Sequence, residues 1–183
     1  TVDSIPLIAS SIMSKKLAAG SDKIVLDVTV GSGAFMKDKE NAVQLAEKMV
    51  AIGNGAGKKT VAILTNMDVP LGKMVGNNLE VVEAIETLKG RGPEDLIAVV
   101  VEIASTMLYL EQIGTKEECM KKVKRVIADG SALEKLKLMV ERQGGDGSDS
   151  FQTQGRFFQA DPISGKSKGD GCLLYTSDAA DDK

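Results

Sequence analysis

A hydroxyl group and an ammonium group lie four residues apart near the start of the chain, at Ser11 and Lys15. On a helix this spacing places both side chains on one face, within reach of one small planar ligand, and Ser14 extends the same polar stripe. The same residues also fit an ordinary solvated helix edge. The spacing alone leaves both interpretations open.

A second group of candidate residues follows the first β-branched run of the chain, at Gly31-Ser32-Gly33. The run is similar to a shortened phosphate-binding glycine loop, but it lacks the third glycine of a dinucleotide motif and the Lys-Ser/Thr ending of a P-loop. By itself the motif favours a plain turn from strand to loop. Ligands of open α/β sheets bind beyond the carboxyl ends of the strands, so we take residues 29–33 and 65–72 as the candidate site.

Several classes of chemistry and partner are excluded by composition. The 183 residues include no histidine, which rules out Ser-His-Asp, Cys-His and histidine-metal sites. A net charge of −3 and an aromatic content of 3% do not favour nucleic-acid binding. Cys119 and Cys172 form neither a metal motif nor a disulfide framework, so we expect a reducing, cytoplasmic setting. No apolar stretch approaches the roughly 18 residues of a membrane span, and we expect no membrane association.

Apolar periodicity and turn residues predict the elements that carry these candidates. The predicted elements are a helix from residue 5 to Gly20, a strand at 23–30, a helix at 40–53, a strand at 60–64, and helices at 77–88, 94–110, 116–128 and 131–142. The alternation of helix and strand in the first half predicts an α/β fold with a parallel or mixed sheet and flanking helices.

The composition changes near the end of the chain. Residues 144–183 hold seven glycines and only three aliphatic side chains larger than alanine, too few to offset the entropy of ordering the backbone. We therefore predict a partial α/β domain at 1–146 and a disordered tail at 147–183. The end of that tail looks like translated adapter or out-of-frame DNA, and a genuine flexible tail is the alternative. Because the first residue is Thr1 rather than Met, we expect a truncated fragment of a longer protein.

Several motifs occur in unbroken order along residues 1–146. They are TVDSIPLIASSIMSKKLA at 1–18, VTVGSGAFM at 28–36, PLG at 70–72, Gly76-Asn77, Glu80-Val81, Glu83-Ala84 and QGGD at 143–146. Together these motifs resemble the pyrimidine nucleoside phosphorylase and thymidine phosphorylase family. The resemblance implies that residues 1–146 are part of the catalytic α/β domain of the nucleoside phosphorylase and phosphoribosyltransferase type.

The resemblance implies a pentosyltransferase, a class of glycosyltransferase. Such an enzyme uses inorganic phosphate as co-substrate to cleave uridine, thymidine or deoxyuridine reversibly into the free base and a (deoxy)ribose 1-phosphate. Phosphate is itself the nucleophile, so the reaction needs no histidine base. The family also implies a cytoplasmic homodimer. We expect the fragment itself to be inactive, because the family's phosphate-binding loop, base-clamping arginine and helical domain precede Thr1.

Site residues also follow from the resemblance. Ser11 and Lys15 match family residues that contact the pyrimidine, and Lys15 would stabilise the negative charge of the departing base as the catalytic residue. The backbone carbonyls of Leu71 and Met74 and the carboxylate of Glu83 match ligands of a monovalent cation such as K⁺. An ordinary surface acid is the alternative interpretation of Glu83.

The sequence differs from the family pattern at one position, and two other functions are alternatives. Family members commonly carry lysine where this chain has Thr29, so any charge supplied there is absent. An anthranilate phosphoribosyltransferase-like enzyme shares the fold but uses a diphosphate-sugar donor, and the Ser11 and Lys15 pair argues against it. A noncatalytic α/β domain is the alternative from outside enzymes.

Overall fold

A computed structural model describes residues 4–145, 147 and 173–177 of the chain. Its elements in chain order are α1 (Ile5–Ala18), β1 (Lys23–Val30), α2 (Lys39–Gly55), β2 (Lys59–Asn66), α3 (Asn77–Leu88), α4 (Glu94–Leu110), α5 (Lys116–Ala128), α6 (Ser131–Arg142) and β3 (Leu173–Ser177). Within the described residues no helix is long and apolar enough to cross a membrane.

The sheet is mixed and has the strand order β1-β2-β3. β1 and β2 pair in parallel along their whole length, from Lys23 opposite Lys59 to Val30 opposite Asn66. β3 pairs antiparallel with the outer edge of β2. The predicted α/β class with a parallel or mixed sheet and flanking helices is therefore confirmed.

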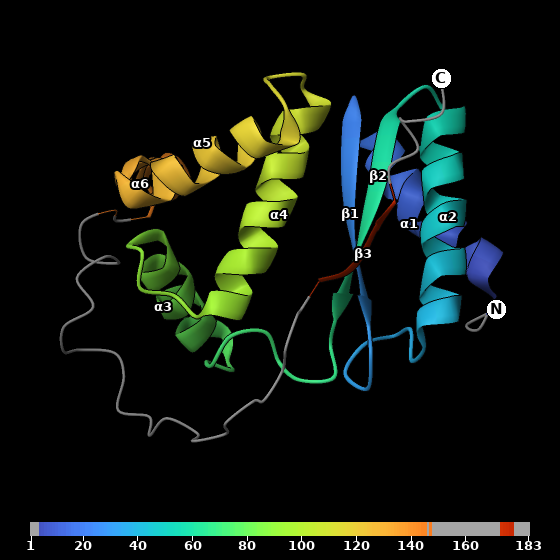
Figure 1. Cartoon of the computed structure of the whole chain (residues 1–183), viewed down its shortest axis with the longest axis horizontal. Helices are drawn as coiled ribbons and strands as arrows, with labels where there is room; N and C mark the ends of the chain where they lie inside the picture. The colour runs from blue at the N-terminus through green and yellow to red at the C-terminus, as the bar shows by residue number, and fades with distance from the viewer. Residues whose placement is uncertain (1–3, 146, 148–172, 178–183) are drawn as a thin grey trace.

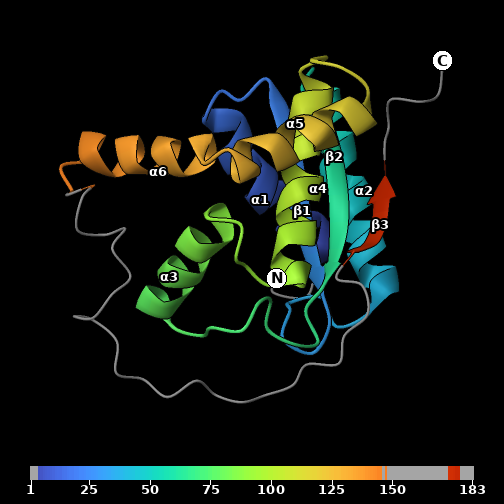
Figure 2. The ribbon, with the colours of Figure 1, turned by 60° about the vertical axis from the view of Figure 1, so that its left-hand side comes forward.

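Helices cover both faces of the sheet (Figure 1). α1 and α2 pack against one face, and α4 covers the other, as the rotated view in Figure 2 shows. Alternate residues of β1 enter the core between the sheet and α1 and α2, as a strand's period of two requires. The buried members of this core are Ala9, Met13, Ile24, Leu26, Val28, Val30, Met36, Ala42, Leu45, Ala46, Met49, Val50, Ala62 and Leu64.

Local sequence signals explain where the helices begin. Asp38 precedes α2 and its side chain accepts a hydrogen bond from the Asn41 N–H at 2.8 Å, which satisfies one of the free donors of the first turn. This hydrogen bond lowers the pKa of Asp38 because it favours the charged form. α5 begins with a capping box in which Thr115 and Glu118 bond to each other's backbone.

The six helices among the described residues end in the same way. The second residue beyond each helix has a positive φ, and these residues are Gly20, Gly57, Gly90, Gln112, Gly130 and Gly144. Glycine adopts this left-handed conformation without steric cost, which is why it is the common residue at this position. α4 is the exception, because Gln112 adopts a φ of 57° there.

The predicted tail lies mostly outside the described residues. Of residues 147–183, the structure describes Gly147 and β3, and the prediction of disorder stays a prediction for the rest. At β3 the backbone forms a strand instead, with Ala62 opposite Ser177. The outer edge of β2 offers unpaired backbone donors and acceptors, and any extended segment can satisfy them irrespective of its side chains.

Candidate functional site

The two loops at the carboxyl ends of β1 and β2 meet at the lower edge of the sheet in Figure 1. The Ser32 N–H donates to Asp68 Oδ1 at 2.8 Å, and Ser32 Oγ donates to the Asp68 carbonyl at 3.2 Å. The Gly33 N–H donates to the Met67 carbonyl at 2.9 Å. The structure therefore brings together the two loops that the sequence predicted as the candidate site.

The glycine run in the first loop is a turn rather than an open cradle for phosphate. The N–H groups of Ser32 and Gly33 are used by the second loop, and the Gly31 N–H donates to the Met36 carbonyl at 2.9 Å. Gly31 has a φ of 137°, and a Cβ there would lie 2.6 Å from the Asp68 nitrogen. These glycines are required because the two loops approach so closely, which favours the plain turn.

Beyond β2, the chain wraps around the carboxylate of Glu83. The side chain is only 6% exposed, and its Oε1 and Oε2 accept hydrogen bonds from the N–H groups of Lys73 at 2.9 Å and Met74 at 3.4 Å. Gly72 makes this approach possible, because it has a φ of 76° and a Cβ there would lie 2.2 Å from Glu83 Oε2. Glu83 is therefore buried against the loop of Leu71 and Met74, and it is not an ordinary surface acid.

The carboxylate of Glu83 is an acidic side chain beside this loop that could serve as a ligand of a hard cation. None of the ion pairs among the described residues involves Glu83, so its buried carboxylate is held by the two backbone N–H groups and not by a lysine or arginine. A buried carboxylate in that state favours binding of a positive ion. The described residues contain no group of three or more His, Cys, Asp or Glu side chains that could hold a metal. A cation here would therefore depend on backbone carbonyls, which suit K⁺ or Na⁺ better than a transition metal.

Ser11 and Lys15 lie on the exposed side of α1, opposite the fully buried Ala9 and Met13. Ser14 Oγ donates to the Ser11 carbonyl at 3.1 Å. In the part of the chain that the structure describes, neither Ser11 Oγ nor Lys15 Nζ has a hydrogen bond or ion pair. Both groups are therefore available to a ligand, and their role in binding a pyrimidine stays a prediction.

Two acidic residues at this edge have contacts that were not predicted: Asp68, which lies inside the predicted loop 65–72, and Asp95, which lies outside both predicted loops. Asp68 accepts from Ser32 in the other loop, and Asp95 Oδ2 accepts from the Gly72 N–H at 3.0 Å. Asp95 has a plain sequence explanation as an acid in the first turn of α4, where it favours the helix dipole. Its second contact lies 23 residues away in sequence, and nothing in the local pattern indicates it.

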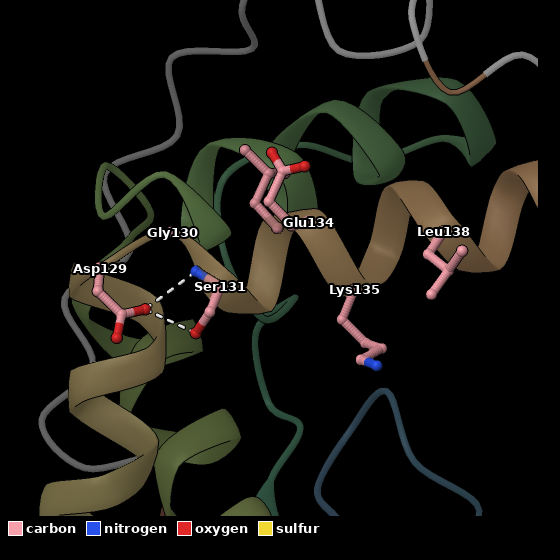
Figure 3. Close-up of a pocket in the computed structure, with 7 residues that line it drawn as sticks. Asp129, Gly130, Ser131, Glu134, Lys135 and Leu138 are labelled. Atoms are coloured by element: carbon pink, nitrogen blue, oxygen red, sulfur yellow. Dashed lines mark hydrogen bonds between the residues drawn. The ribbon is translucent and has the colours of Figure 1, made fainter.

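A shallow surface hollow at the start of α6 shows no comparable chemistry (Figure 3). Asp129 Oδ1 accepts from the N–H and Oγ of Ser131, at 2.9 and 2.6 Å, and this pair lowers the pKa of Asp129. Lys135 and Leu138 project to the other side of the helix from Glu134. Asp129 binds the first residue of α6 and so helps this helix to begin. We therefore do not regard this hollow as the functional site.

Comparison with known proteins identifies the domain. Residues 1–133 match the glycosyl transferase family, a/b domain. The chain belongs to this family. Residues 1–133 include β1 and β2, with α1 and α2 on one face of the sheet and α4 on the other. They form the α/β domain of a family 3 glycosyl transferase.

Close relatives of this glycosyl transferase domain carry one name. The chain is 55% identical over 149 residues to the pyrimidine-nucleoside phosphorylase of Bacillus subtilis (strain 168), a match that covers 81% of the chain and 34% of the relative. It is 56% identical over 147 residues to that of Staphylococcus haemolyticus, and 55% identical over 149 residues to that of Geobacillus stearothermophilus. The chain thus spans about one third of the length of these relatives.

Proposed function

We propose that this domain is part of a pyrimidine-nucleoside phosphorylase, a pentosyltransferase that acts on uridine, thymidine or deoxyuridine. The observation that carries the proposal is the identity of 55% across about four fifths of the chain to proteins of that name. The activity belongs to the protein at the full length of its relatives, since the chain spans 34% of them. These relatives do not favour the anthranilate phosphoribosyltransferase-like alternative, nor a noncatalytic domain.

The proposed reaction exchanges one bond at C1′ of the pentose. The C–N bond to the base breaks and a C–O bond to inorganic phosphate forms. The pyrimidine leaves with the electron pair and takes up the proton that the hydrogen phosphate loses as it becomes the sugar phosphate ester. Lys15 would donate hydrogen bonds to the base as negative charge develops on it, and Ser11, one turn earlier, would hold the ring in register. The exposure and lack of partners of both groups in the described residues support these roles.

A monovalent cation, K⁺, would be held by the carbonyl oxygens of Leu71 and Met74 and by the carboxylate of Glu83. Bound there, the ion would fix the loop that follows β2. The burial of Glu83 against the backbone of Lys73 and Met74 supports this assignment. A homodimer in the cytoplasm completes the proposal.

The test is phosphorolysis of uridine by the protein at the length of its relatives, comparing Lys15→Ala with Lys16→Ala. Lys16 is the matched control because it is an exposed lysine on the same helix, one residue away. Loss of one charged donor to the departing base should reduce kcat/KM by roughly 100- to 1,000-fold in Lys15→Ala. Lys16→Ala should retain activity.

Equal rates in the two variants would refute the role of Lys15. Release of base with a diphosphate donor but not with inorganic phosphate would refute the phosphorylase assignment. Ser11→Ala should cost less than Lys15→Ala, roughly tenfold, because a neutral hydrogen bond contributes less than a charged one.

A further inference from the structure

Three successive backbone N–H groups after β2 are held by two carboxylates from two different helices. The Gly72 N–H donates to Asp95 Oδ2 at 3.0 Å, and the next two N–H groups, of Lys73 and Met74, donate to Glu83 at 2.9 and 3.4 Å. Glu83 lies on α3 and Asp95 on α4. Each carboxylate therefore fixes a different peptide group of the same turn.

The contact of Asp95 determines the direction of a carbonyl group. A trans peptide unit is planar, and its N–H and C=O point in opposite directions. The Gly72 N–H shares its peptide unit with the Leu71 carbonyl, and the described residues contain no cis peptide bond. Because Asp95 holds that N–H, the Leu71 oxygen must point away from Asp95.

Asp95 is well placed to hold this orientation. Its other oxygen, Oδ1, accepts from the N–H of the next residue, Leu96, at 2.8 Å. The side chain is half-buried, and none of the ion pairs among the described residues involves it. One oxygen thus fastens the carboxylate to the first turn of α4 while the other fastens the turn that follows β2.

We propose that Asp95 is a positioning residue for the cation site, because it fixes the direction of the Leu71 carbonyl that would bind the ion. The inference rests on the proposed function, which places K⁺ at Leu71, Met74 and Glu83. Asp95 itself would not be a ligand, because its Oδ2 bonds to the N–H end of the peptide unit whose carbonyl oxygen would bind the ion.

The experiment uses the protein at the length of its relatives and three variants. Asp95→Ala removes the acceptor, Asp95→Asn keeps an acceptor oxygen of the same shape, and Glu94→Ala removes one negative charge at the neighbouring exposed position. The first readout is hydrogen–deuterium exchange of the peptide that spans residues 70–76, without K⁺. The second is the dependence of Tm on KCl concentration, at ionic strength held constant with choline chloride.

We expect Asp95→Ala to speed exchange in residues 70–76 and to raise the Kd for K⁺ five- to tenfold, the effect of one hydrogen bond. Asp95→Asn should restore most of both properties, and Glu94→Ala should change neither. Equal K⁺ affinity in Asp95→Ala and Glu94→Ala would overturn the proposal. If K⁺ does not raise Tm in the unsubstituted protein, the proposed cation site fails and this inference fails with it, whereas faster exchange in Asp95→Ala alone would still locate the contact with Gly72.

Discussion

Replacing Gly72 with alanine should destabilise the domain more than the same change at another glycine of equal backbone conformation. Gly72 and Gly90 have φ angles of 76° and 77°. They differ in their surroundings, because a Cβ on Gly72 would lie 2.2 Å from Glu83 Oε2, whereas a Cβ on Gly90 would have nothing within 4 Å. Comparing the two alanine variants therefore separates the loss of stability due to backbone conformation from the loss due to displacing Glu83.

The magnitudes follow from these two terms. An alanine in the left-handed region costs about 1 kcal/mol or somewhat more, and this is the whole expected effect of Gly90→Ala. In Gly72→Ala the buried carboxylate must also move, and it leaves the N–H groups of Lys73 and Met74 without their acceptor. Breaking buried bonds to a charged group adds about 1–3 kcal/mol, so we expect about 2–4 kcal/mol in total.

The assay is urea unfolding of the chain and both alanine variants, followed by circular dichroism at 222 nm. The two variants should share the slope of the unsubstituted chain and differ in midpoint, because the change affects stability rather than compactness. If Gly72→Ala and Gly90→Ala cost the same within about 0.5 kcal/mol, Glu83 does not lie against Gly72, and the described geometry of residues 71–74 is wrong.

Two other predictions concern stability away from the site. Arg91, and to a lesser extent Lys89, hold the pKa of Glu86 at about 2 instead of 4.5. The stability from this contact is complete above about pH 4.5 and is lost as the pH falls toward 2. Glu86→Gln should therefore remove about 1–2 kcal/mol of the pH dependence of the unfolding free energy, measured by urea titrations between pH 7 and 2.5. An unchanged pH dependence would contradict the contact. Gln112→Gly should raise stability by about 0.5–1 kcal/mol, because Gln112 has a φ of 57° at a helix end; a lower Tm would show that its side chain has a compensating contact.

The elements of the fold could be predicted because their signals are local. Apolar periodicity and glycine at the helix ends located all six helices to within one or two residues. β2 was predicted too short, at 60–64 instead of 59–66. Its two ends are the polar Lys59 and Asn66, which are strand residues only because they pair with Lys23 and Val30 of β1. Such pairing is a property of the folded sheet, and a hydrophobic pattern does not contain it.

The features of the site also divide into those that a local or family signal predicts and those that depend on contacts distant in sequence. The edge of the sheet at the carboxyl ends of the strands was predictable from topology, and family motifs singled out Glu83 and Met74, which the structure places in contact. The hydrogen bonds of Asp68 and Asp95 were not predicted, because their partners are distant in sequence, 36 residues away at Ser32 and 23 residues away at Gly72. The local sequence around a short polar side chain does not indicate a hydrogen-bond partner that is distant along the chain.

The bonds between the loops after β1 and β2 have a mechanical consequence. Ser32 and Gly33 are fastened to Asp68 and Met67 by three hydrogen bonds, so neither loop can shift without dragging the other. The two loops thus hold each other in place at this edge of the sheet without a bound ligand. A ligand bound at this edge would therefore meet the two loops as one continuous surface.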